Sequence, residues 1–142
     1  MELKYMELIN GFENCPPINC QSRNTVGYRF VFEDLGNTNN YIPPLAIDPT
    51  RINTPKFCAD PNRCSGYALS MFSDAQSARK SYEKMAKNNK NIHKTLGTHI
   101  AEFTILETDG IISPPSCSGH FDLHEFAEAD FTNRVRLICN AH

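Results

Sequence analysis

The chain has 142 residues, of which 40% are hydrophobic and 21% are charged, and its formal net charge is −2. These values are typical of one soluble globular domain spanning residues 1–142, and they exclude an intrinsically disordered chain. The slightly acidic balance argues against general nucleic-acid binding through a basic surface. No apolar run is long enough for a membrane span, and residues 1–8 lack the apolar core of a signal peptide, so we expect a cytoplasmic protein.

The six cysteines allow three interpretations, namely reduced thiols, disulfides or a zinc site. We expect reduced thiols, because the sequence shows no secretion signal and is long enough to form a hydrophobic core. Cys15 and Cys20, and likewise Cys58 and Cys64, are spaced more widely than the cysteines of compact zinc sites. No metal site is therefore favoured at these positions.

The first half of the chain predicts one strand and a great deal of irregular structure. Residues 1–24 are interrupted by consecutive prolines, and we expect them to run over the surface of the domain. The β-branched and aromatic run 26–32 predicts a strand, with the charged Arg29 inside it. Residues 33–65 carry turn-forming residues every few positions, which predicts a long Pro/Asn-rich cover loop without regular elements.

A strand followed by the main helix is predicted over residues 66–88. The apolar and small residues from Tyr67 to Phe72 are typical of a buried strand. Ser73 or Asp74 is a suitable N-cap for a helix over residues 74–88. In that helix, apolar side chains recur every three or four residues, so one face is expected to pack against a sheet.

Three more strands are predicted, at residues 98–107, 120–126 and 134–139. Turn residues separate them, including Thr108-Asp109-Gly110 after the first. The elements together predict an α+β fold. We expect a twisted, mostly antiparallel sheet of five or six strands, one main helix packed on it, and the long cover loop.

Among the polar residues of the predicted strands are Arg29, Ser70 and Glu125, in that order along the chain. This order resembles the layout of ADP-ribosyltransferases of the Arg-Ser-Glu kind, in which these residue types come from three strands around an NAD cleft. Residues 66–82 also resemble the strand-to-helix segment of the poly-ADP-ribose-polymerase branch, which runs Gly, an apolar strand, Phe-Ala-Asp and Ser-Lys-Ser-Ala ahead of a Tyr. The matching positions are Gly66, Leu69, Phe72-Ser73-Asp74, Ser77-Ala78 and Tyr82.

The chain also departs from the polymerase branch of that family at two points. Val26-Gly27-Tyr28-Arg29 stands where the polymerase branch has His-Gly-Thr or His-Gly-Ser, and neither Ser70 nor Met71 supplies its nicotinamide-stacking tyrosine. The resemblance nevertheless implies a fold with a nucleotide cleft lined by its strands.

The resemblance implies a transferase-like protein that binds NAD, as a substrate, or a related nucleotide, with or without catalysis. Its implied catalytic residues are Glu125, which would polarise a ribose hydroxyl, Arg29, which would pair with phosphate, and Ser70, which would orient the sugar. A protein would then be the modification target. The implied contacts with the cofactor are Arg29, Ser70, Ser73, Tyr67 and His120.

Two chemical alternatives stay open beside this one. His120, Asp122 and His124 share a face of an extended strand and are residue types that bind transition metals, although such a face is more often a solvated sheet surface. Cys117 lies three residues before His120 in a flexible loop, which is compatible with an activated thiol or with an ordinary loop cysteine.

The alternative function is a non-enzymatic protein-binding module. Tyr41, Phe57 and Tyr67 lie in or beside predicted loops, and exposed aromatic side chains in ordered loops often anchor a protein partner. This hypothesis requires the three rings to be accessible.

Overall fold

The computed structural model describes residues 1–142, except for the side chain of Asp60. Its centre is a six-stranded antiparallel sheet in the order β4-β5-β2-β1-β3-β6. The predicted α+β class and the predicted number of strands are confirmed. The strands are β1 (Thr25–Val31), β2 (Leu69–Phe72), β3 (His99–Ile105), β4 (Gly110–Ile112), β5 (His120–Glu125) and β6 (Val135–Asn140).

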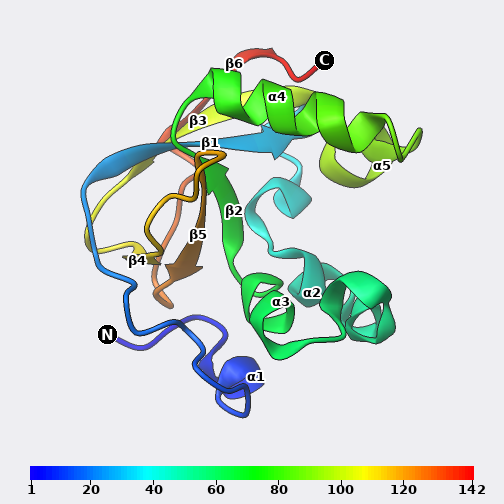
Figure 1. Ribbon diagram of the computed structural model, residues 1–142. Helices are drawn as coiled ribbons and strands as arrows, with labels where there is room; N and C mark the ends of the chain where they lie inside the picture. The colour runs from blue at the N-terminus through cyan, green and yellow to red at the C-terminus, as the bar shows by residue number, and fades with distance from the viewer.

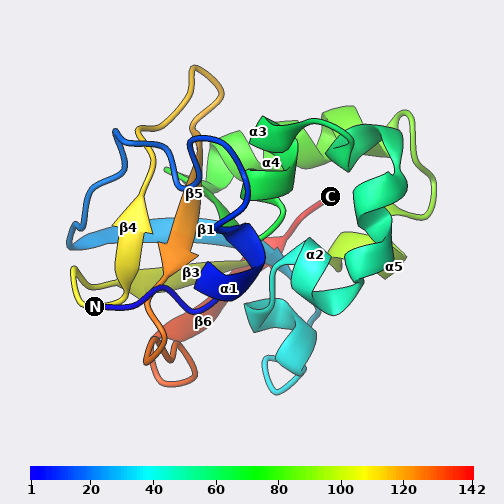
Figure 2. The same cartoon turned by 90° about the horizontal axis from the view of Figure 1, so that it is seen from below.

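The sheet is divided into two halves that cross at a steep angle (Figures 1 and 2). One half consists of β1, β3 and β6, and the other of β2, β4 and β5. β1 pairs with β3 along its whole length, whereas it shares a single register pair with β2, that of Tyr28 and Phe72. β1 and β2 therefore diverge from the point where Tyr28 and Phe72 pair, and the sheet opens beside that point.

The main helix, α4 (Ala75–Ala86), lies over β1 and β3 (Figure 1). Asp74 is its N-cap, and the side chain accepts a hydrogen bond of 2.7 Å from the backbone N–H of Ser77. Tyr82 is buried against the sheet, and its hydroxyl donates to the carbonyl oxygen of Gly97 at 2.8 Å. The predicted helix is confirmed, with an end two residues earlier than expected.

Residues 33–65 contain five short helices, so the expectation of a loop without regular elements is wrong. Most prolines of this segment lie in the first turn of a helix, Pro44, Pro49 and Pro55 among them. A missing N–H costs no hydrogen bond at that position. Residues that interrupt longer elements thus begin short ones here. The helices are η1 (Thr38–Tyr41), α2 (Pro44–Ile47), η2 (Pro49–Asn53), η3 (Pro55–Phe57) and α3 (Asp60–Ser65).

The sequence did not predict α1 (Met6–Ile9), α5 (Ile92–Leu96) or β4. Each has five residues or fewer, too short for an apolar periodicity to become visible. β4 begins at Gly110, within the turn expected after the strand of residues 98–107. None of the helices in the described chain combines the length and the apolar character needed to cross a bilayer.

A disulfide joins Cys15 to Cys64 and ties the N-terminal segment to α3. The expectation of reduced thiols is therefore wrong for this pair, because residues 49 positions apart are brought together by a fold that their spacing does not reveal. Cys20, Cys58, Cys117 and Cys139 are free. The N-terminal segment is also anchored by Ile9, whose side chain is buried.

Three clusters of buried side chains form the core. The first draws residues from both halves of the sheet, the second lies between α4 and the sheet, and the third lies between the N-terminal segment and the short helices. The third contains Phe57 and Tyr67, which are 3% and 6% exposed. The short helices are therefore packed onto the rest of the protein by their own apolar residues.

Candidate functional site

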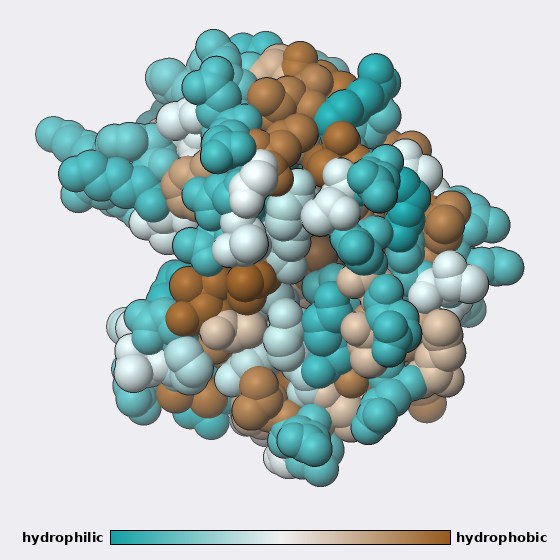
Figure 3. Space-filling view, turned by 180° about the vertical axis from the view of Figure 1, so that it is seen from behind, coloured by the Kyte–Doolittle hydropathy of each residue, from teal (hydrophilic) through white to brown (hydrophobic). Residues whose placement is uncertain are grey.

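A cleft of about 520 Å³ opens where β1 and β2 diverge. α4 and α5 line one side, the helices η1 to η3 line the other, and residues of β1, β2 and β5 form its floor. Figure 3 shows the molecule from behind, where the surface is indented between a hydrophilic projection and a lower part with a hydrophobic rim. Aromatic rings of Phe30, Phe32 and Phe72 contribute to the lining.

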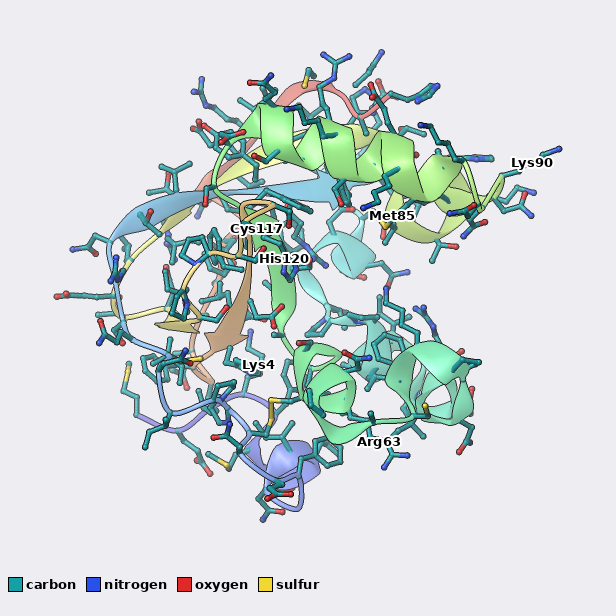
Figure 4. All side chains as sticks on the ribbon, viewed as in Figure 1. Lys4, Arg63, Met85, Lys90, Cys117 and His120 are labelled. Carbon is teal, nitrogen blue, oxygen red and sulfur yellow. A yellow bond between two sulfur atoms is a disulfide. The ribbon has the colours of Figure 1, made fainter. Side chains whose placement is uncertain are left out.

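Ser70 and His120 form a hydrogen-bonded pair on this floor. Ser70 Oγ lies 2.6 Å from His120 Nε2. In the register of β2 with β5, Phe72 is opposite His120, so Ser70 is its diagonal neighbour on the same face. Figure 4 shows His120 near the junction of the two halves and Met85 extending from α4 toward the same space. The pair is thus exposed to any ligand that enters the cleft.

A tight turn places His120 at the start of β5. Gly119 precedes it with φ at 82°, a conformation that favours glycine, and a Cβ there would crowd the side chain of Ser77. Ser73 holds the turn, since its backbone N–H and its hydroxyl both donate to the carbonyl oxygen of Gly119, at 2.9 and 3.2 Å. Ser73 is exposed and lies outside the cleft lining, so its contact is with the turn.

Asp122 lies close to this pair but does not complete a catalytic triad. Its Oδ1 is 3.6 Å from His120 Nε2, the nitrogen that already contacts Ser70, and its Oδ2 accepts a hydrogen bond from Ser65. In a triad the carboxylate holds the other ring nitrogen. The arrangement suits hydrogen bonding to a ligand hydroxyl better than activation of a serine nucleophile.

Arg29 bridges the two diverging strands. Its Nε donates to the carbonyl oxygen of Asn40 at 3.0 Å, and its Nη1 donates to that of Ser70 at 3.2 Å. Desolvation lowers the pKa of Arg29 to about 10, against the opposing effect of the Glu125 carboxylate. Arg29 also lines the cleft, and its two hydrogen bonds fix the backbone of Ser70 and the position of η1.

Glu125 lies outside the cleft lining, in the interior at the far end of β5. It is 3% exposed, and its Oε2 accepts a hydrogen bond of 2.9 Å from Lys4 Nζ, while Oε1 has no partner among the described residues. Burial raises the pKa of Glu125, and Lys4 and Arg29 act in the opposite direction. The residue of β5 that shares the cleft with Ser70 is therefore His120.

Of the six residues predicted for the site, the structure brings Arg29, Ser70 and His120 together in one cleft. Tyr67 is buried in the third core cluster, where its ring packs near Tyr5 and Phe12. Ser73 lies at the Gly119 turn, and Glu125 lies beside Lys4. Tyr67, Ser73 and Glu125 are therefore outside the cleft lining.

The sequence did not point to the cations that line the cleft beside Arg29, namely Arg51, Lys56 and Lys94. They come from η2, η3 and α5, which were not predicted as elements. A signal was present in residues 51–56, which hold two cations and no acid. Asp48 is the acidic residue of the lining, and its side chain accepts hydrogen bonds from Thr50.

The other candidates from the sequence take positions of their own. His124 is 3% exposed, its Nε2 lies 3.9 Å from Cys64 Sγ, and burial lowers its pKa. Cys117 is exposed and lies outside the cleft lining. Within the described side chains, no group of three or more His, Cys, Asp or Glu residues is placed to hold a metal ion.

The three aromatic residues expected as exposed anchors are not exposed. Phe57 and Tyr67 belong to the third core cluster, and the half-buried Tyr41 donates its hydroxyl to the carbonyl oxygen of Leu35 at 2.7 Å. The expectation of accessible rings is wrong. Tyr41 and Phe57 lie in short helices whose apolar residues pack inward, and Tyr67 lies in the buried turn between α3 and β2.

No protein-family model matches this chain, and no curated protein or solved structure matches it with significance. In the structure Arg29, Ser70 and His120 lie on the three neighbouring strands β1, β2 and β5 and line one cleft.

Proposed function

We propose that the protein is ADP-ribosyltransferase-like and binds NAD, or a related nucleotide, in the cleft between the two halves of the sheet. The observation that supports this most is the lining of the cleft, where the Ser70–His120 pair, four cations and several aromatic rings occur together. NAD offers ribose hydroxyls to the pair, phosphates to the cations and flat rings to the aromatic side chains.

Catalysis places an additional demand on this site. Cleavage of the glycosidic bond of NAD passes through an oxocarbenium-like state, which a nearby carboxylate stabilises. The resemblance assigns this role to Glu125, whose carboxylate is engaged by Lys4. Because Glu125 lies outside the cleft lining, turnover through it requires the Lys4 ion pair to open and the carboxylate to move into the cleft. Without that rearrangement the protein binds the nucleotide and does not cleave it through Glu125. Asp122 is the carboxylate adjacent to His120.

A thermal-shift titration with NAD tests the proposal. Because a ligand that binds the native state raises its apparent stability, we expect the Tm to rise with NAD concentration, and the rise to be lost in His120→Gln. Cys117→Ser, a change in the neighbouring exposed loop, is the matched control and should respond like the wild type. No shift of the wild type at millimolar NAD would contradict nucleotide binding. Chromatography of released nicotinamide then separates an active transferase from a silent one.

The cytoplasmic location stays a prediction. It requires the Cys15–Cys64 bond to be reduced in the cell, since disulfides persist mainly in oxidising compartments. Labelling of free thiols in freshly lysed cells that produce the protein naturally tests this, and an intact bond would contradict a cytoplasmic location.

A further inference from the structure

Two cations of the cleft lining contact the same aromatic ring. Arg51 Cζ is 5.2 Å and Lys56 Nζ is 5.4 Å from the centroid of the same ring, that of Phe57. Because Phe57 is 3% exposed and packed into the third core cluster, this ring is a fixed platform. The short helices η2 and η3 thus hold two positive charges together at a defined place in the cleft lining.

The described carboxylates do not neutralise these two charges. Among the described side chains, no carboxylate forms an ion pair with Arg51 or Lys56. Asp48 accepts hydrogen bonds from Thr50 instead. Burial, followed by the charge of Arg51, lowers the pKa of Lys56, as expected for two adjacent and partly desolvated cations. An anion bound between them would relieve this repulsion.

Arg29 is poorly placed to bind the same anion. Two of its donor groups are already used, Nε for the carbonyl oxygen of Asn40 and Nη1 for that of Ser70. With Nε–H engaged, the bidentate contact with phosphate through Nε and Nη2 is lost, and the guanidinium is held in place by the two carbonyl groups. Lys94, on α5 at the other side of the cleft, adds a cation to the lining without such constraints.

We infer that Arg51 and Lys56 form the phosphate site of the cleft, and that they bind the pyrophosphate of a nucleotide whose ribose reaches Ser70 and His120. The identity of the nucleotide rests on the proposed function, whereas the phosphate site rests on the cation pair over Phe57. Arg29 then acts as a positioning residue, and the phosphate contact that the family resemblance implies for it is made by residues of the cover segment.

Isothermal titration calorimetry with inorganic pyrophosphate and, separately, with NAD tests this inference. The variant is Arg51→Ala/Lys56→Ala, and the matched control is Lys84→Ala/Lys87→Ala, which removes two exposed lysines at the end of α4 that do not line the cleft. We expect the variant to bind both ligands about tenfold to a hundredfold more weakly, the effect of losing charged hydrogen bonds to phosphate. The control should change little, and the wild-type affinity should fall with added salt.

The outcomes separate the phosphate site from the proposed function. Equal NAD affinity in the variant and the wild type overturns the phosphate site and leaves the proposed function in place. If the wild type binds pyrophosphate but not NAD, and the variant loses pyrophosphate binding, the phosphate site is supported and the proposed function is overturned. Absence of binding by the wild type overturns both.

Two further checks guard against other causes. An equal loss of affinity in the lysine control overturns the phosphate site, because affinity would then follow net charge. Circular dichroism verifies that the double variant is folded. If it is not, the single variants Arg51→Gln and Lys56→Gln replace it, and unchanged pyrophosphate affinity in both overturns the inference.

Discussion

The carboxyl group of Glu125 is buried at the end of β5, and its pKa lies above the ordinary value of 4.5 because of that burial. An acid with a higher pKa in the folded state holds its proton more tightly when the protein is folded. Its contribution to the free energy of unfolding therefore falls as the pH rises from about 4.5 through the folded pKa. The ion pair with Lys4 reduces this loss without reversing the direction of the pKa shift.

We expect Glu125→Gln to remove this pH dependence. The free energy of unfolding of the variant minus that of the wild type should be more positive at pH 7 than at pH 4.5, since glutamine keeps the shape and carries no charge. Urea unfolding of both proteins at the two pH values measures the effect. A difference between the proteins that is the same at both pH values would show that Glu125 does not titrate in this range.

Arg29 contributes a second prediction at this scale, because its guanidinium satisfies two carbonyl groups where β1 and β2 diverge. Lysine keeps the charge but cannot donate in two fixed directions, so Arg29→Lys leaves one carbonyl unpaired. We expect it to lower the free energy of unfolding by about 1–3 kcal/mol. Arg79→Lys, on the exposed face of α4, is the matched control. If the denaturation curves of Arg29→Lys and Arg79→Lys coincide, a bridging role for Arg29 is contradicted.

At the scale of elements, the sequence predicted what a pattern of several residues can encode. β1 and α4 have seven and twelve residues, long enough for β-branched and amphipathic patterns to be recognised. The short helices of residues 33–65 lack such patterns and are held by tertiary contacts. The choice of His120 over Glu125 as the cleft residue of β5 follows from the register of β5 with β2, which the sequence does not display.

The disulfide links the segment after α1 to one of those short helices, because Cys15 follows α1 and Cys64 lies in α3. Closing a loop of this length restricts the unfolded chain by about 4 kcal/mol on the chain-entropy model. We expect Cys15→Ser/Cys64→Ser to lose most of that free energy of unfolding, and a thiol reductant to destabilise the wild type but not the variant. Cys58→Ser/Cys117→Ser, at two exposed free thiols, should behave like the wild type. Identical urea curves for the oxidised and reduced wild type would exclude this contribution.

At the scale of the whole molecule, the two halves of the sheet share only one backbone register pair, yet they share one core. The cluster between them includes Leu69, Met71 and Leu123 from one half and Val31, Phe103 and Ile105 from the other. Neither half can bury its apolar face without the other. Side-chain packing, more than strand pairing, therefore makes the halves fold as one unit.

This coupling predicts that damage in one half is felt in the other. Leu123→Ala removes a fully buried side chain of β5 and should cost about 2–5 kcal/mol. Hydrogen exchange should then become faster in β3 as well as in β5, because both exchange through the same global opening. Leu137→Ala, where the leucine on β6 is 39% exposed, is the matched control with a small effect. If amides of β3 keep their protection while those of β5 lose it, the halves open separately, and the cleft between them lies between two independent units.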